Sequence, residues 1–179
     1  SFTYTKMSKL FSTGLKSLDV AEITQIPEDW DKFWQVARIN YDFIFNRNSK
    51  NMTWRYLTNP NKYHILTLRQ KGDLMGYLVY RIQCDESEKH VVITDFLTIP
   101  GNEKLVIAGI NYIKEQAFKT GSNRISVWCD QNNPYYRLLK KTRFITRSDI
   151  PVICYQNSFA NKIKTCSRWH FTIGDSDNI

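Results

Sequence analysis

The sequence predicts an α/β fold in which a mixed, mostly antiparallel central sheet is flanked by helices. Three consecutive segments, at residues 63–70, 74–83 and 91–99, have the period of two that is typical of strands, and polar turns separate them. Such short turns favour an antiparallel meander. A helical segment at 103–119 and a strand at 124–129 follow. A strand, a helix and a strand in this order imply a right-handed parallel crossover within one sheet.

Before the meander, the sequence predicts an arm and a helix. Residues 1–27 lack clear periodicity apart from a candidate strand at 20–26, and we expect them to form an N-terminal arm or a linker from a preceding lobe. The domain itself is expected to span residues 28–179. Pro27 and the two acids after it favour a helix start. Apolar residues at steps of three and four extend this predicted helix to about Asn46.

Glycine and proline mark the boundaries in the second half of the chain. Pro100 and Gly101 break the third strand, and Gly121 is the expected left-handed cap of the helix that follows. Pro134 favours the first turn of a further helix, which is expected to end at Lys141. The remaining predictions are a helical turn at 51–57, a hairpin formed by 144–146 and 152–155, and a last strand at 169–173.

The composition is that of one globular domain without a membrane span. The 179 residues are 42% hydrophobic, which suffices for a substantial core, and no apolar run approaches the roughly 18–20 residues that cross a bilayer. The start of the chain lacks the pattern of a secretory leader, and the four cysteines and three histidines lack metal-site spacing. We therefore expect reduced cysteines, no bound metal and a cytoplasmic location. The net charge of +8 favours an anionic partner, although the basic residues are dispersed.

The order of elements, with its break at Pro100-Gly101, resembles that of the Gcn5-related N-acetyltransferase (GNAT) family over about residues 28–156. The resemblance implies that acetyl-CoA lies where the strands on either side of the crossover helix splay apart. The free amides that begin this helix would hold the diphosphate, since a helix N-terminus carries a partial positive charge. The implied contacts are Leu97, Thr98 and Ile99 for pantetheine, and Gly101, Asn102, Glu103 and Lys104 for the diphosphate.

The turn before this helix departs from the family pattern, so the coenzyme motif is degenerate. The family usually has Arg or Gln, two further residues, Gly, one residue, and Gly or Ala. At this turn the chain has a single glycine, Gly101, which stands between Pro100 and Asn102. Glu103, an acid where the resemblance places an anion, also suits the first turn of an ordinary helix.

A second family signature is partly kept. Asn132 stands where an asparagine leads into the next helix. The tyrosine that often protonates the departing thiolate in the family is replaced here by Leu139. Tyr135 and Tyr136, one turn earlier, are the candidate substitutes, and a core or surface role is the alternative for both.

Asp95 is the candidate general base. It is the one acid between Val91 and Pro100, and an acid inside an apolar strand costs free energy unless it is paired or functional. Burial of this carboxyl group would raise its pKa toward the range of a base. The alternative is a structural hydrogen bond between Asp95 and either a group on a neighbouring strand or Arg81. The amide of Leu97 or of Thr98 would be the oxyanion donor.

Two further motifs resemble a GNAT-like branch found near surface-polysaccharide genes. They are Trp54-Arg55-Tyr56 with Pro60, and the C-terminal run of residues 169–177. Proteins of that branch often have two tandem lobes, and this chain is similar to the second lobe. The resemblance therefore implies a second GNAT-like lobe, or a second copy of the chain, as a partner.

Three functions follow as hypotheses. The first is an acyl-CoA-dependent N-acyltransferase that transfers an acetyl group to the primary amine of a small molecule, with an amino sugar as the candidate acceptor. The second is a catalytically degenerate lobe that binds a partner domain or an anionic ligand. The third is an aminoacyl-tRNA-dependent transferase of related fold, which would use the charge of +8 and would bind tRNA in a salt-sensitive way.

Overall fold

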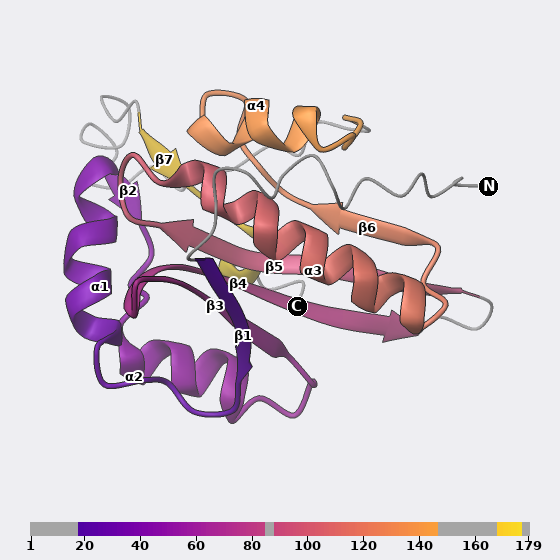
Figure 1. The fold of residues 1–179 in the computed structure, drawn as a ribbon, viewed down its shortest axis with the longest axis horizontal. Coiled ribbons are helices and arrows are strands. Elements are labelled where there is room, and N and C mark those ends of the chain that lie inside the picture. The colour runs from indigo at the N-terminus through magenta and orange to yellow at the C-terminus, as the bar shows by residue number, and fades with distance from the viewer. Residues whose placement is uncertain (1–17, 85–87, 147–167, 177–179) are drawn as a thin grey trace, which may run out of the picture.

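Figure 1 shows the computed structural model, which describes residues 18–84, 88–146 and 168–176. A central five-stranded sheet has the strand order β1-β3-β4-β5-β6, and β2 and β7 form a separate two-stranded sheet. Only the β5–β6 pairing of the central sheet is parallel. The predicted architecture, a mostly antiparallel mixed sheet flanked by helices, is confirmed. Within the described residues, no helix combines the length and apolar character that a bilayer crossing requires.

The antiparallel meander forms as predicted. It consists of β3 (His64–Gln70), β4 (Asp73–Cys84) and β5 (Lys89–Thr98). The turn between β3 and β4 is tight because Lys71 and Gly72 adopt positive φ angles of 52° and 92°. Two consecutive residues with positive φ form the hairpin turn that matches the natural twist of two strands.

An additional strand precedes the meander. β1 (Leu18–Ile23) pairs antiparallel with β3 and forms one edge of the central sheet. The candidate strand at residues 20–26 is therefore present, with its bounds shifted toward the N-terminus. The sheet begins inside the segment 1–27 that we expected to be an arm, since β1 satisfies the otherwise open edge of β3. Residues 1–17 lie outside the described residues.

The first helix is shorter than predicted. α1 spans Trp30–Ala37, a 3₁₀ turn follows at Arg38–Asn40, and the chain then becomes extended as β2 (Phe43–Ile44). β2 pairs in parallel with β7 (Trp169–His170). The prediction of a helix to Asn46 was wrong because this strand pairing comes from the other end of the described chain, which local periodicity does not reveal.

The helical turn expected at residues 51–57 is present. It begins as α2 (Ser49–Met52) and continues as a π-helical turn, Thr53–Leu57. Asn48 caps its start, because the side-chain oxygen accepts a hydrogen bond from Asn51 N at 2.9 Å.

The parallel crossover also forms as predicted. A 3₁₀ turn at Glu103–Leu105 leads into α3 (Val106–Lys119), and Gly121 then has the expected left-handed φ of 72°. β6 (Arg124–Val127) returns parallel to β5, and α4 (Pro134–Lys141) follows.

The predictions near the C-terminus are only partly met. Residues 144–146 form no strand, and their expected partner at 152–155 lies outside the described residues. The last strand is shorter than the predicted 169–173. After β7, Ile173–Asp175 form a 3₁₀ turn, because the side chains of Thr172 and Asp175 cap each other's backbone amides.

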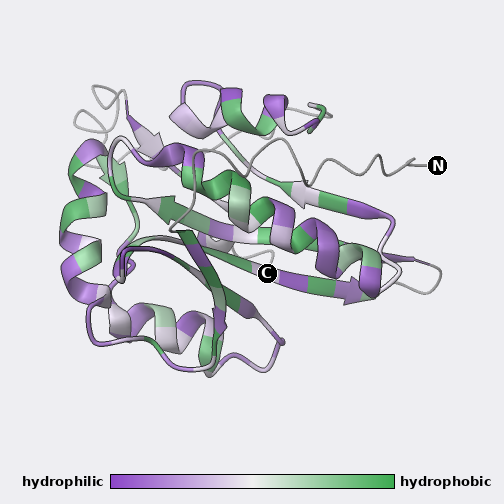
Figure 2. Ribbon diagram, viewed as in Figure 1, coloured by the Kyte–Doolittle hydropathy of each residue, from purple (hydrophilic) through white to green (hydrophobic). Residues whose placement is uncertain are grey.

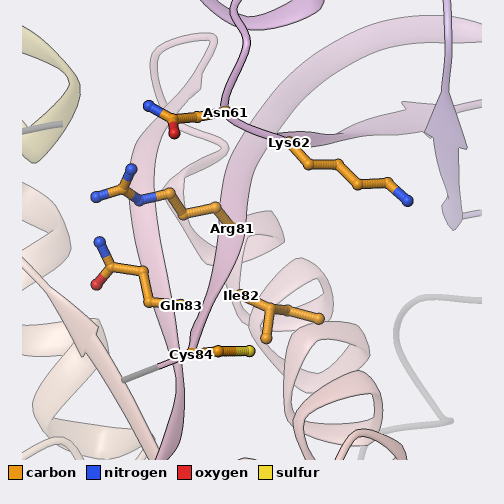
Figure 3. A pocket seen from close by; sticks show the side chains of 6 residues that line it. All are labelled: Asn61, Lys62, Arg81, Ile82, Gln83 and Cys84. Atoms are coloured by element: carbon orange, nitrogen blue, oxygen red, sulfur yellow. The ribbon is translucent and has the colours of Figure 1, made fainter. Parts of the chain in front are cut away.

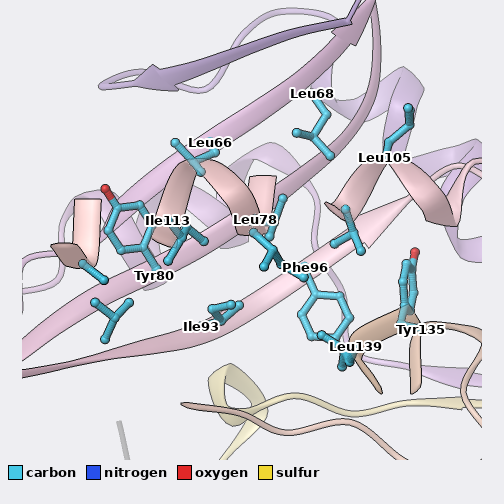
Figure 4. Packing of buried hydrophobic residues seen from close by; sticks show 14 residues of the cluster. Leu66, Leu68, Leu78, Tyr80, Ile93, Phe96, Leu105, Ile113, Tyr135 and Leu139 are labelled. Atoms are coloured by element: carbon cyan, nitrogen blue, oxygen red, sulfur yellow. The ribbon is translucent and has the colours of Figure 1, made fainter. Parts of the chain in front are cut away.

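Both faces of the central sheet are buried. In Figure 2, the central strands carry many of the apolar residues, and the helices alternate between apolar and polar residues. One core cluster joins the sheet to α3 and α4, and Figure 4 shows its packing, which includes Leu78, Ile93, Phe96, Ile113 and Tyr135. The other cluster joins the opposite face to α1 and α2 and includes Trp30, Phe33, Met52, Tyr77 and Leu97.

A β-bulge in β5 decides which face Asp95 occupies. The pairing of β5 with β4 skips Thr94, which lies between Ile93 and Asp95. The extra residue switches the alternation of side chains. As a result, Ile93 packs in the cluster under α3, whereas Leu97 packs in the cluster under α1.

Candidate active site between strands β5 and β6

β6 pairs with β5 over its whole length but covers only part of β5. Their parallel pairing runs from His90 opposite Arg124 to Ile93 opposite Val127, where β6 ends. β5 continues to Thr98, so its last residues extend beyond the pairing. The structure therefore has an opening where the resemblance to acetyltransferases places the acyl donor. We call it the β5–β6 opening.

A cavity of about 270 Å³ lies at the end of this opening. Its walls come from the end of β5, the turn before α3, the start of α4, and the residues that flank β2 and β7. Three predicted cofactor residues, Thr98, Glu103 and Asn132, line the cavity together with Ala37, Asn40, Tyr41, Pro100, Asn133, Pro134, Arg168 and Trp169. We call it the opening cavity.

Tyr135 projects from the first turn of α4 into the β5–β6 opening. Its hydroxyl oxygen accepts a hydrogen bond from Thr98 N at 2.8 Å and lies 2.9 Å from Thr98 Oγ1. Its ring packs edge-to-face on Phe96, with the ring centroids 5.1 Å apart. Burial raises the pKa of Tyr135 to about 12, although its hydrogen bonds with Thr98 lower it. The hydroxyl group is therefore protonated at neutral pH.

His170 of β7 reaches the same strand edge. Its Nε2 lies 2.8 Å from Phe96 O, and its Nδ1 lies 3.2 Å from Asn133 Nδ2. Because a carbonyl oxygen only accepts hydrogen bonds, Nε2 carries the proton and Nδ1 accepts from the asparagine amide. Burial lowers the pKa of His170 well below its ordinary value, and the positive charge of Arg47 adds to this effect. The imidazole is therefore neutral.

The main-chain groups of β5 that face the opening are those of Phe96 and Thr98. Ile99 N donates to Met75 O at 2.9 Å, so Ile99 faces β4, and the alternation along the strand turns the main chain of Leu97 the same way. Of the three residues predicted to pair with pantetheine, only Thr98 presents its main chain to the opening. The predicted oxyanion donor of Leu97 likewise faces β4.

The turn before α3 has both favourable and unfavourable features for an anion. Gly101 has a φ of 79°, and a Cβ placed on it would meet no atom within 4 Å, so this backbone is open to a ligand. However, Gly101 N already donates to Glu103 Oε1 at 3.0 Å, and Asn102 N donates to Ile99 O at 3.2 Å. Lys104 is exposed beside them. The Glu103 carboxylate thus accepts the hydrogen bond of Gly101 N, an amide that the resemblance assigns to a diphosphate.

Asp95 lies on the α1 side of the sheet and is only 1% exposed. Its carboxylate accepts hydrogen bonds from Arg47 Nε at 3.0 and 3.1 Å, and from Phe96 N at 2.9 Å. The hydroxyl groups of Tyr56 and Tyr77 donate to its Oδ2 at 3.2 and 3.1 Å. Burial raises the pKa of Asp95, and the Arg47 guanidinium opposes this rise. This arrangement matches the structural alternative for Asp95, with Arg47 in the place expected for Arg81.

Arg47 connects Asp95 to the C-terminal segment. It is 3% exposed, and its Nη2 lies 2.6 Å from Asp175 Oδ2. Arg55 contacts the same turn through Gly174 O and through Asp175 Oδ1, the latter at 3.3 Å. The two motifs that the sequence singled out, at residues 54–56 and 169–177, therefore meet in the structure.

The structure separates the two tyrosine candidates on α4. Tyr136 points away from the opening, and its hydroxyl lies 3.0 Å from Thr146 Oγ1 on the exposed side of the helix. Asn132 lines the opening cavity, and its neighbour Asn133 caps α4 by accepting from Tyr135 N at 3.2 Å. The sequence did not identify Asn133 or His170 as site residues. The cap signal before Pro134 indicates Asn133, and His170 lies within the motif at residues 169–177, although that motif gave it no role of its own.

A second cavity lies away from the predicted site residues. Figure 3 shows its labelled lining, and its volume is about 310 Å³. It lies beside the end of β4, which pairs with the start of β5. Its lining consists of Asn61, Lys62, Arg81, Ile82, Gln83 and Cys84, none of which is a predicted site residue.

Comparisons with known proteins identify the fold. No family model matches the chain, and no curated protein matches it. Among solved structures, a putative acetyl transferase from Pyrococcus furiosus has a TM-score of 0.57 at 16% identity, covering 77% of this chain and 99% of that chain. A Trypanosoma brucei acetyltransferase has a TM-score of 0.57 at 13% identity, covering 77% and 99%. An aminoglycoside acetyltransferase, HMB0005, from an uncultured soil metagenomic sample has a TM-score of 0.54 at 19% identity, covering 76% and 99%.

These similarities cover nearly the whole of each solved structure, so the chain has the complete fold that these acetyltransferases share. At such low identities the likeness concerns the fold alone. The fold expected from the resemblance to the GNAT family is thereby confirmed.

Proposed function

We propose that this chain is an acyl-CoA-dependent N-acyltransferase that acetylates the primary amine of a small molecule. The observation that carries the proposal is the end of β6 at Val127, which leaves the last residues of β5 without a parallel partner strand beside a cavity lined by Thr98, Glu103 and Asn132. These residues come from the three segments that the resemblance assigns to acyl-donor binding. The similarity in fold to several acetyltransferases supports the same reading.

The residues at the opening fit acetyl-CoA if two side-chain contacts open, that of Glu103 with Gly101 N and that of Tyr135 with Thr98 N. Gly101 leaves open space at the turn, and Lys104 places a positive charge beside it. Here the Glu103 side chain would have to release Gly101 N. The main chain of Thr98 and the side chain of Asn132 would hold the pantetheine arm. Acetyl-CoA supplies a thioester that a neutral amine can attack.

Tyr135 is the proposed general acid. Its hydroxyl keeps its proton at neutral pH and lies over the edge of β5, inside the opening. It is therefore placed to give a proton to a leaving thiolate. Asp95 was the predicted general base, but its carboxylate already accepts hydrogen bonds from Arg47 and from the hydroxyl groups of Tyr56 and Tyr77. We propose that Asp95 holds the scaffold and that the acceptor amine reaches the site in its neutral form.

An amino sugar is the acceptor that we propose to test first. One protein of similar fold is named for acetylation of aminoglycosides, which carry amino sugars, and another is named for acetylation of a ribosomal-protein alanine. The opening cavity, at about 270 Å³, has the size for a small ligand rather than for a folded protein.

Binding and transfer test this proposal. At a hundredfold excess over its dissociation constant, acetyl-CoA should add about 2.7 kcal/mol to the free energy of unfolding, which raises the melting temperature by roughly 5–10 °C. Mixing the protein with acetyl-CoA and glucosamine should release the free thiol of CoA, and CoA alone serves as the product control. No thermal shift at millimolar acetyl-CoA would contradict the proposal.

A second candidate function is a degenerate lobe that binds a partner, such as a preceding GNAT-like lobe, without doing chemistry. The observation that favours it is the occupation of the donor site by the chain itself, through Glu103 at Gly101 and Tyr135 at Thr98. It predicts that the longest product of the gene is active and that Tyr135→Phe leaves this activity unchanged. A large loss of activity in that variant would exclude the degenerate lobe.

A further inference from the structure

The edge of β5 that faces the opening is occupied by the chain's own side chains. Thr98 N donates to Tyr135 Oη at 2.8 Å, and Phe96 O accepts from His170 Nε2 at 2.8 Å. Phe96 N donates to Asp95 Oδ1 at 2.9 Å. An incoming amide chain that pairs with this edge must use the same main-chain groups, because a strand presents only alternate residues to each neighbour.

One asparagine connects the two side chains that cover the edge. Asn133 Nδ2 lies 3.2 Å from His170 Nδ1 and donates to Trp169 O at 3.2 Å. Asn133 Oδ1 accepts from Tyr135 N, also at 3.2 Å. Tyr135 and His170 are therefore held against β5 as one unit, although α4 and β7 supply them from distant parts of the chain.

The two contacts differ in how firmly they are held. His170 is fully buried, and the segment that carries it is fixed by the ion pairs of Asp175 with Arg47 and Arg55. Tyr135 is also buried, but Thr98, whose amide it holds, lines the opening cavity, whereas Phe96, whose carbonyl holds His170, is not among the lining residues. The tyrosine contact is therefore the one with a partner at the cavity from which a ligand would enter.

We propose that Tyr135 and His170 form a latch on the edge of β5, and that an acyl donor pairs with this edge only after the tyrosine hydroxyl has released Thr98 N. This inference rests on the proposed acyltransferase function. In the free protein the Tyr135 hydroxyl group occupies Thr98 N, which the acyl donor also needs. The hydroxyl group therefore competes with the acyl donor and weakens its binding. Removing the hydroxyl group should strengthen that binding, because Thr98 N then lacks a partner until the ligand arrives.

The test compares Tyr135→Phe with Tyr136→Phe as the matched control. Both variants remove one hydroxyl group from adjacent positions of α4, but only Tyr135 contacts β5. Isothermal titration with acetyl-CoA should show about 3- to 10-fold tighter binding for Tyr135→Phe, which is the range of one neutral hydrogen bond. Tyr136→Phe should bind like the unmodified protein. Equal or weaker binding by Tyr135→Phe overturns the latch, whereas no binding by any of the three proteins overturns the proposed function itself.

Hydrogen exchange provides a readout that needs no ligand. The amide of Thr98 should exchange faster in Tyr135→Phe, while the amide of Leu97, which faces β4, should keep its protection. Tyr136→Phe should change neither amide. Unchanged protection of Thr98 in Tyr135→Phe would overturn the latch even if the variant folds and binds acetyl-CoA.

Discussion

Arg47 Nε lies 3.0 Å from Asp95 Oδ2, and both side chains are almost completely buried. Although burial lowers the pKa of Arg47, the carboxylates of Asp95 and Asp175 hold it above its ordinary value. The guanidinium also donates to Phe45 O at 2.8 Å. Burying two charges costs free energy, which ion pairing offsets only when the remaining donors and acceptors are also satisfied. The hydrogen bonds at both ends of this pair meet that condition.

Asp95→Asn should therefore destabilise the fold. The variant leaves a buried guanidinium with only one carboxylate, and breaking a buried pair costs about 3–5 kcal/mol. Denaturant unfolding should show this loss, whereas Asp73→Asn, at the exposed start of β4, should stay within about 0.5 kcal/mol of the unmodified protein. A variant with normal stability but no transferase activity would instead assign Asp95 to the chemistry.

The C-terminal turn should be coupled energetically to Arg55. Asp175 accepts from Arg47 at 2.6 Å and from Arg55 at 3.3 Å, so its removal should cost about 3 kcal/mol of unfolding free energy. Arg55→Ala should cost less, about 1 kcal/mol, because its side chain is partly exposed. A double-mutant cycle of Arg55→Ala with Asp175→Ala should give a coupling energy of about 0.5–1.5 kcal/mol. Strict additivity would mean that the ion pair contributes nothing.

The free energy of unfolding should decrease as the pH is lowered, because of His170. Burial keeps this histidine neutral in the fold, whereas the unfolded chain binds a proton near pH 6.5. Below that pH the unfolded state holds more protons than the folded state. The stabilisation is therefore complete above about pH 6.5 and is lost as the pH falls toward the lowered pKa of His170 in the folded protein. The loss between pH 8 and pH 5 can reach at most about 2 kcal/mol, a limit set by the pKa of histidine in the unfolded chain.

His170→Phe provides the control for this pH dependence. The variant should be less stable than the unmodified protein at pH 8, since Phe96 O loses its buried donor. The stability difference between the two proteins should shrink on going from pH 8 to pH 5, because the variant lacks the histidine that titrates. Parallel stability curves for the two proteins over this range would contradict the neutral assignment of His170.

Glu103→Gln should tighten acetyl-CoA binding. The carboxylate holds Gly101 N and would repel a diphosphate at the start of the helix. Neutralising it should lower the dissociation constant about 3- to 10-fold, with a smaller effect at high salt. Glu115→Gln removes the same charge from the exposed face of α3 and should leave the affinity unchanged. An equal response to both substitutions would show that only the overall charge matters.

Local chemistry was sufficient to predict most of the fold. The period of two defined the meander, Gly72 suited the positive φ of its first turn, and Gly121 capped α3 as expected. These features depend on residues that are close together in the chain. The opening beyond the end of β6 was instead expected from the resemblance to the GNAT family. The extension of α1 to Asn46 failed because a distant strand competes with the helix there.

The sequence by itself also determined that Asp95 must be paired or functional. The resemblance to the GNAT family added the expectation that Asn132 and a tyrosine would lie near the break. Only the tertiary structure decided that Arg47 is the partner of Asp95, that Tyr135 rather than Tyr136 faces the opening, and that His170 closes the edge of β5. The physical reason is that burial and hydrogen bonding of these groups depend on segments 37 to 74 residues apart in the chain. A β-bulge at Thr94, invisible to periodicity, then sets which face each side chain occupies.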